Sequence, residues 1–154
     1  KAGTHDGGAY TVGVRMCRLS NGFYVVEDVK RGQWGTNQRE DIIKQTAIAD
    51  GQTVHVWIEQ EPGSAGIDSS ASTIRNLAGF VIKAERPTGD KATRADAFSV
   101  QVNNGNVILM VGEWNRAYVT ELRFFPFSTF KDQTDASSGC FNHLVSKRIA
   151  RRVI

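Results

Sequence analysis

The fold class follows from one stretch, Thr53-Val54-His55-Val56-Trp57-Ile58-Glu59, which is the most strand-like run in the chain. Its β-branched and aromatic residues are typical of a β-strand. Residues 36–39 can cap a helix, and Ile42 and Ile43 continue it at helical spacing up to Gly51. A strand that follows a helix, after a pair of earlier strands, favours a mixed sheet with helical cover.

The earlier pair of strands is expected over residues 9–17 and 23–29. Asn21-Gly22 lies between them and is a tight-turn dipeptide, so the pair is predicted to form a hairpin. On the C-terminal side, the pattern predicts helices over 70–77, 94–102, 114–124 and 133–147, and strands over 80–84 and 107–111. The resulting order, β-β-α-β-α-β-α-β-α-α, predicts an α/β domain.

Composition narrows the class of protein. The chain has 154 residues and a net charge of +3, from Lys+Arg 19 against Asp+Glu 16. This length fits one domain over 1–154, and so small a charge excludes a histone-like polycation. No apolar run reaches the roughly 18 residues of a membrane span, so no membrane is expected as a partner. The two cysteines, Cys17 and Cys140, form no C-x-x-C pair, which favours a reducing, cytosolic setting.

Two pairs of acidic residues are candidates for chemistry. Glu59 ends the central strand, and Glu61 would face the same way if the strand continued. Asp132 and Asp135 begin the last helix, and their spacing of three places both on one face. Such oxygen-rich groups bind Mg²⁺ or Mn²⁺. The alternatives are a helix cap for either aspartate and a solvated side chain for Glu59.

Basic residues bracket the turn at 87–90. Lys83 and Arg86 precede this turn, and Lys91 and Arg94 follow it. They can track the phosphates of a nucleic acid, or form a solvated rim. A second basic group, Lys147, Arg148, Arg151 and Arg152, is expected to be a frayed end or a linker rather than a DNA reader.

Beyond these patterns, several segments resemble the large terminase subunit of tailed bacteriophages. The likeness runs in order along nearly the whole chain and falls on that family's C-terminal nuclease domain. It implies an RNase H-like fold, a mixed sheet flanked by helices, that cuts concatemeric double-stranded DNA with two divalent metal ions. The segments that carry it are 9–13, 31–34, 58–66 (Ile-Glu-Gln-Glu-Pro-Gly-Ser-Ala-Gly), 86–95 (Arg-Pro-Thr-Gly-Asp-Lys-Ala-Thr-Arg-Ala), 105–107 and 132–136.

The resemblance also implies roles for individual residues. Glu59 is similar to the family's metal ligand on the central strand, Asp132 to the ligand on the final helix, and Asp135 to a second acid of the same motif. Mg²⁺ or Mn²⁺ in a two-metal site is therefore expected. Arg86, Lys91 and Arg94 are expected to contact the DNA backbone.

The chain also departs from the family pattern. The family's first acid lies on an opening strand, which is expected upstream of Lys1, with Asp6 as the nearest substitute. Ala9 and Lys131 stand where the family often carries acids. These changes remove negative charge from the expected metal site, so poor cleavage by this chain is predicted.

The leading hypothesis is therefore a divalent-metal-dependent endonuclease domain of a DNA-packaging terminase, in the cytoplasm of the phage's host. Its expected partners are double-stranded DNA, the terminase ATPase domain, the portal and the small terminase subunit. One alternative is another RNase H-like nuclease such as a resolvase, against which segments 58–66 and 86–95 argue. The other is a non-catalytic RNase H-like module of the packaging motor that binds DNA or docks a partner.

Overall fold

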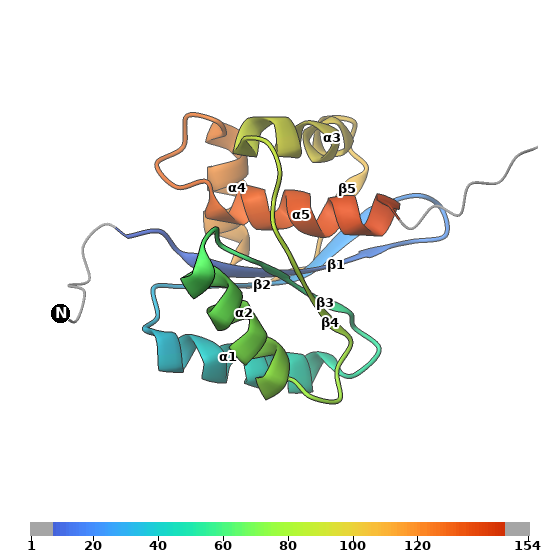
Figure 1. Cartoon of the computed structure of the whole chain (residues 1–154). Helices are drawn as coiled ribbons and strands as arrows, with labels where there is room; N and C mark the ends of the chain where they lie inside the picture. Colours follow the sequence, from blue (N-terminus) through green and yellow to red (C-terminus); the bar gives the residue numbers. More distant parts are fainter. Residues whose placement is uncertain (1–7, 147–154) are drawn as a thin grey trace, which may run out of the picture. The chain divides into compact units, whose positions relative to one another are not determined.

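The structure, a computed structural model, describes residues 8–146, and its elements follow the predicted order (Figure 1). The mixed α/β class is confirmed. The strands are β1 (Thr11–Arg18), β2 (Tyr24–Gly32), β3 (Val56–Glu59), β4 (Ile82–Glu85) and β5 (Val107–Leu109). The helices are α1 (Thr36–Asp50), α2 (Ser64–Asn76), α3 (Lys91–Asn103), α4 (Asn115–Phe124) and α5 (Asp132–Ser146).

Two compact units make up the chain. The first comprises Lys1–Gln33 and Gly89–Ile154, and the second comprises Trp34–Thr88. The single domain over 1–154 stays a prediction. Asp6 and the basic residues Lys147, Arg148, Arg151 and Arg152 lie outside the described residues. Within 8–146, no helix is long and apolar enough to cross a membrane.

The first unit contains a three-stranded mixed sheet in the order β1-β2-β5. β1 and β2 form the predicted antiparallel hairpin, whose turn is closed by the Leu19 N–H donating to the Phe23 carbonyl at 2.8 Å. Gly22 takes a φ of +91° there, a conformation that suits glycine. β5 pairs with β2 in parallel. The predicted buried strand over 107–111 is shorter than expected and lies at a sheet edge, where Ile108 is 43% exposed.

Helices α3, α4 and α5 lie on the same side of this sheet (Figure 1). Their contact with the sheet forms the core, in which Val26 from β2, Phe98 from α3, Tyr118 from α4 and Phe141 from α5 are almost fully buried. α5 packs against both β1 and α3. This packing fixes the first turn of α5 beside the first turn of α3.

The second unit contains a separate two-stranded parallel sheet, β3-β4. α2 connects the two strands, as parallel pairing requires a crossover, and it packs on β4 while α1 packs on α2. One mixed sheet was the expectation from sequence. In the described residues β3 and β4 instead pair only with each other, because strand partners depend on long-range contacts that the local pattern does not contain.

Candidate functional site

The acidic pair of α5 lies where the sequence predicts it. Asp132 is the first residue of the helix and Asp135 follows within the same turn. Their side chains are only 16% and 8% exposed. Carboxylates this buried need charged or hydrogen-bonding partners, because desolvation penalises the ionised form.

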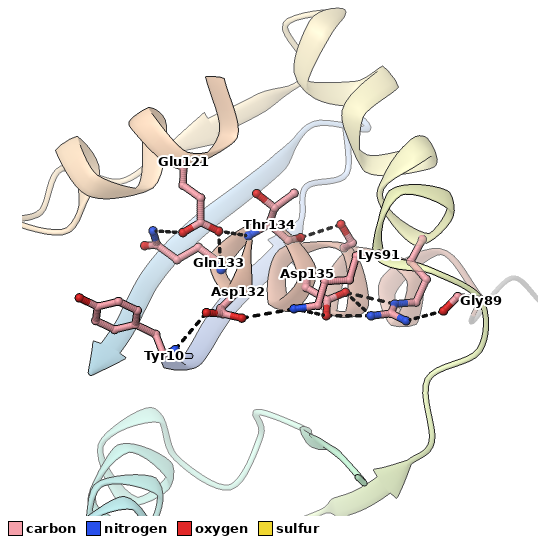
Figure 2. Close-up of polar contacts among 10 residues, drawn as sticks. Tyr10, Gly89, Lys91, Glu121, Asp132, Gln133, Thr134 and Asp135 are labelled. Atoms are coloured by element: carbon pink, nitrogen blue, oxygen red, sulfur yellow. Dashed lines mark hydrogen bonds and ion pairs between the residues drawn. The ribbon is translucent and has the colours of Figure 1, made fainter. Parts of the chain in front are cut away.

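Asp132 has a partner on each carboxylate oxygen (Figure 2). The backbone N–H of Tyr10, just before β1, donates to Oδ2 at 3.0 Å. The Lys91 ammonium donates to Oδ1 at 3.2 Å. Asp132 therefore joins the start of β1 and the start of α3 to the start of α5.

Asp135 forms the shortest ion pair of this region. The Arg94 guanidinium donates to it from Nη2 at 2.6 and 2.7 Å and from Nε at 3.1 Å. Arg94 also donates from Nη1 to the Gly89 carbonyl at 2.8 Å. The Lys91 Nζ lies 3.5 Å from Oδ2 of Asp135, so the Lys91 ammonium bridges the two aspartates. Two cations thus compensate two acids, in geometry that favours charge-assisted hydrogen bonds.

The turn at 87–90 explains how α3 presents both cations to α5. Gly89 adopts a φ of +75°, and Asp90 then caps α3 by accepting the Thr93 N–H at 2.8 Å. That backbone hydrogen bond lowers the pKa of Asp90, so the cap stays ionised at neutral pH. Lys91 and Arg94 follow at a spacing of three, which places them on one face of the helix.

The charge of Lys91 is stabilised by its neighbours. Burial opposes the ammonium, but the hydrogen bond to Asp132 and the attraction of Asp135 outweigh burial and raise the pKa of Lys91. The ammonium therefore remains charged throughout the neutral range, and any divalent cation that binds these two aspartates must displace it.

Glu121 is a site residue that sequence reasoning missed. This glutamate on α4 is 5% exposed, and its Oε1 accepts the N–H groups of Gln133 at 2.7 Å and Thr134 at 3.0 Å. Oε2 accepts the Gln133 side-chain N–H at 2.8 Å. Glu121 thus caps α5 from a different helix and fixes the turn that carries both aspartates (Figure 2). Its spacing within α4 carries no signal of this role.

Glu59 lies in the second unit and has a different setting. It is exposed, ends the four-residue strand β3, and is in register with Glu85 of β4. β3 ends at Glu59 and does not continue to Glu61, so the condition under which both glutamates would share a strand face is not met. The ladder extends only to Gln60, whose N–H donates to the Glu85 carbonyl at 2.8 Å.

The loop after β3 is shaped by glycine. Gly63 precedes α2 with a φ of +91°, and Gly66 in the first turn of α2 lies against the Glu61 carbonyl. A Cβ at Gly66 would overlap that carbonyl oxygen. Gly63 and Gly66 are therefore required by the backbone, because they let α2 begin directly against the chain that leaves β3.

The remaining candidates stay predictions. Arg86 follows β4 in the second unit, whereas Lys91 and Arg94 belong to the first and are engaged by aspartates. A joint role of Glu59 with Asp132 and Asp135 is likewise a prediction. Between residues 8 and 146, no group of three or more histidine, cysteine, aspartate or glutamate side chains is placed to hold a metal ion.

Comparisons with protein-family models, with curated proteins and with solved structures give no match for this chain. A functional proposal for this chain therefore rests on the resemblance of its sequence segments, on the fold class and on the geometry of the site.

Proposed function

We propose that this chain is the RNase H-like endonuclease domain of a phage DNA-packaging terminase, which hydrolyses double-stranded DNA with Mg²⁺ or Mn²⁺. One observation carries the proposal: two aspartates at the start of α5, the half-buried Asp132 and the buried Asp135, are fixed by contacts to the start of β1, to α3 and to α4, and Asp132 lines an open cavity at the surface. The segments that resemble the family include both the aspartates and the two cations that hold them.

The chemical type of the candidate ligands suits Mg²⁺ or Mn²⁺. Carboxylate oxygens are the ligands that Mg²⁺ and Mn²⁺ prefer. Asp132 and Asp135 supply two carboxylates, and Glu59 is proposed as a third. Bound metals would activate a water molecule and stabilise the departing oxygen of the phosphodiester.

The protein's own residues would prepare the site. Glu121 holds the first turn of α5 in place, and the Tyr10 N–H orients one oxygen of Asp132. Arg94 holds Asp135, so Asp132 is the more available ligand. Lys91 compensates both acids, and its ammonium would be free to contact a DNA phosphate if a metal ion took its place between the two carboxylates.

A second candidate function has one observation in its favour. Because Lys91 and Arg94 already neutralise both aspartates, the same surface is also consistent with a non-catalytic module of the packaging motor. Such a module would bind DNA or dock a partner without a metal.

Nicking of supercoiled plasmid with Mn²⁺ separates the two functions. The assay compares this chain with a chimera that carries the family's opening strand and acid before Lys1. We expect slow nicking by the chain, faster nicking by the chimera, and loss of activity in Asp132→Asn and Glu59→Gln chimeras. Asp135→Asn should lose less activity, since Arg94 already occupies that carboxylate.

Asp96→Asn, an exposed acid of α3, is the matched control and should cleave normally. Nicking that is unchanged in both the Asp132 and the Glu59 variants would contradict the site assignment. DNA binding by the folded chimera with no nicking at any Mn²⁺ concentration would support the non-catalytic module.

A further inference from the structure

The ammonium of Lys91 lies between the two aspartates of α5, in contact with the same oxygens that a divalent cation would use (Figure 2). Its Nζ is 3.2 Å from Oδ1 of Asp132 and 3.5 Å from Oδ2 of Asp135. Because Lys91 is attached to α3, this cation is always present at a high effective concentration. A metal ion at these carboxylates therefore has to compete with a cation that the protein itself supplies.

The other contacts of the two aspartates leave this competition to Lys91. The Tyr10 N–H donates to Oδ2 of Asp132, which leaves Oδ1 to the Lys91 ammonium. Among the described residues, Lys91 is the only cation that pairs with Asp132. Arg94 instead holds Asp135, with three N–H groups donating to that carboxylate. Departure of Lys91 would thus uncover Asp132 while Asp135 stays paired.

Lys91 can leave the aspartates without a change in the fold. Its side chain is 43% exposed, and it lines an open cavity of about 390 Å³ together with Asp132. The helix that carries it is held by other residues: Arg94 binds Asp135 and the Gly89 carbonyl, and Phe98 is buried in the core. The ammonium can therefore turn into the water of the cavity while α3 and α5 keep their places.

The charge of the cluster changes sign when Lys91 is removed. Lys91 and Arg94 balance Asp132 and Asp135, so the four side chains sum to zero and attract a cation only weakly. Without the ammonium, one negative charge remains beside the cavity. A divalent cation then gains an attraction and no longer has to break an ion pair.

We propose that Lys91 is a built-in competitor of the divalent cation and keeps the metal affinity of the aspartates at the start of α5 low. The choice of Mg²⁺ or Mn²⁺ as the cation rests on the proposed function. The site then stays without metal at cation concentrations that would load two uncompensated carboxylates. Lys91 is a regulatory residue in this account, and it is not a metal ligand.

Mn²⁺ binding to the chain without DNA tests the proposal, with free Mn²⁺ measured by electron paramagnetic resonance. Lys91→Met should raise the affinity at least about tenfold, because a contact charge is removed from the carboxylates. Lys91→Arg keeps a charged group at the same position and should change the affinity less than about threefold. An unchanged affinity in the methionine variant would overturn the proposal.

Lys131→Met is the matched control. Lys131 lines the same cavity as Lys91, but within the described residues it pairs with neither aspartate. Its loss removes the same charge from the same wall without uncovering a carboxylate, so the affinity should rise less than about threefold in salt. Equal gains in the Lys131 and Lys91 variants would show a general effect of charge and would overturn the competition.

A double variant locates the gain. Lys91→Met with Asp132→Asn should return to the Mn²⁺ affinity of the unaltered chain, because the uncovered carboxylate is lost. A gain that persists in the double variant would place the cation elsewhere and overturn the proposal. Thermal unfolding gives a second measure: Mn²⁺ should raise the melting temperature of the Lys91 variant more than that of the unaltered chain. Lys91→Gln repeats both measurements if the methionine variant does not fold.

The result is separable from the test of nuclease activity. If Lys91→Met gains Mn²⁺ affinity through Asp132 while neither the chain nor the chimera nicks plasmid, the competition holds and the nuclease proposal fails. If the chimera nicks plasmid and loses this activity in its Asp132 variant, while Lys91→Met leaves Mn²⁺ affinity unchanged, the nuclease proposal holds and the role of Lys91 fails.

Discussion

The start of α5 and the loop after β3 both present candidate acids, but they are held by different means. At α5, side chains determine the position: Arg94, Lys91 and Glu121 each bind the turn from another helix. After β3, the backbone determines it, because Gly66 lets α2 begin against the Glu61 carbonyl and Glu59 itself is exposed. Substitution should therefore reduce stability most at charged side chains near the start of α5 and at a glycine in the loop after β3.

The largest effect is expected from Gly66→Ala. Its new Cβ would overlap the Glu61 carbonyl oxygen, a backbone atom that cannot rotate away, so α2 must shift. We expect a loss of about 3 kcal/mol in the free energy of unfolding of the second unit. Hydrogen exchange of the α2 amides measures this loss of stability.

Gly139→Ala is the control for the Gly66 variant. Gly139 lies inside α5 with open space around it, so alanine should stabilise α5 by about 0.5–1 kcal/mol. Normal α2 protection in the Gly66 variant would contradict the backbone explanation.

Glu121→Ala should give the next largest effect, in the first unit. It leaves the N–H groups of Gln133 and Thr134 buried without an acceptor, and a loss of about 2–3 kcal/mol is expected in urea unfolding. Glu121→Gln should lose only about 1 kcal/mol. It keeps one acceptor oxygen, and the Gln133 amide can turn its unpartnered Oε1 toward the new N–H. A loss below about 0.5 kcal/mol for the alanine variant would show that α5 does not depend on this cap.

Arg94→Met should destabilise the first unit by about 2 kcal/mol, because it leaves Asp135 buried with only Lys91 nearby. The value lies below the roughly 3–5 kcal/mol of a fully buried pair since Arg94 keeps some contact with water. In the double variant Arg94→Met with Asp135→Asn, no charge is left unpaired, so most of the loss should be recovered. Urea unfolding of the two single variants and the double variant gives the coupling energy. Additive losses would contradict a direct pair.

The smallest effect is expected at Glu59. Glu59→Gln changes an exposed side chain opposite Glu85 and should alter the free energy of unfolding by no more than about 0.5 kcal/mol. The same variant is expected to abolish nicking in the chimera. Glu59 would then contribute little to the free energy of unfolding and much to activity. A stability loss above about 1 kcal/mol would instead assign Glu59 a structural role.

Local pattern was sufficient for the order of the elements and for one half of the candidate site. β-branched runs, the Asn21-Gly22 turn and apolar residues at helical spacing predicted each strand and helix in sequence order. The spacing of Asp132 and Asp135 placed both on one face of a helix, as the structure has them. These features depend on residues a few positions apart, and such interactions are encoded in the sequence itself.

Tertiary structure alone decided which distant residues meet. Three kinds of contact illustrate this. β3 pairs with β4 across a crossover helix, and Glu121 accepts hydrogen bonds from the start of α5 across a loop. Lys91 and Arg94 form ion pairs with two aspartates that lie about 40 residues further along the chain. A basic residue beside a turn looks the same in sequence whether it faces water, DNA or a buried acid. The packing of α3 and α5 on a common sheet decides which partner the basic residue meets. Burial of the apolar faces of the two helices fixes the positions of the charged side chains on their other faces.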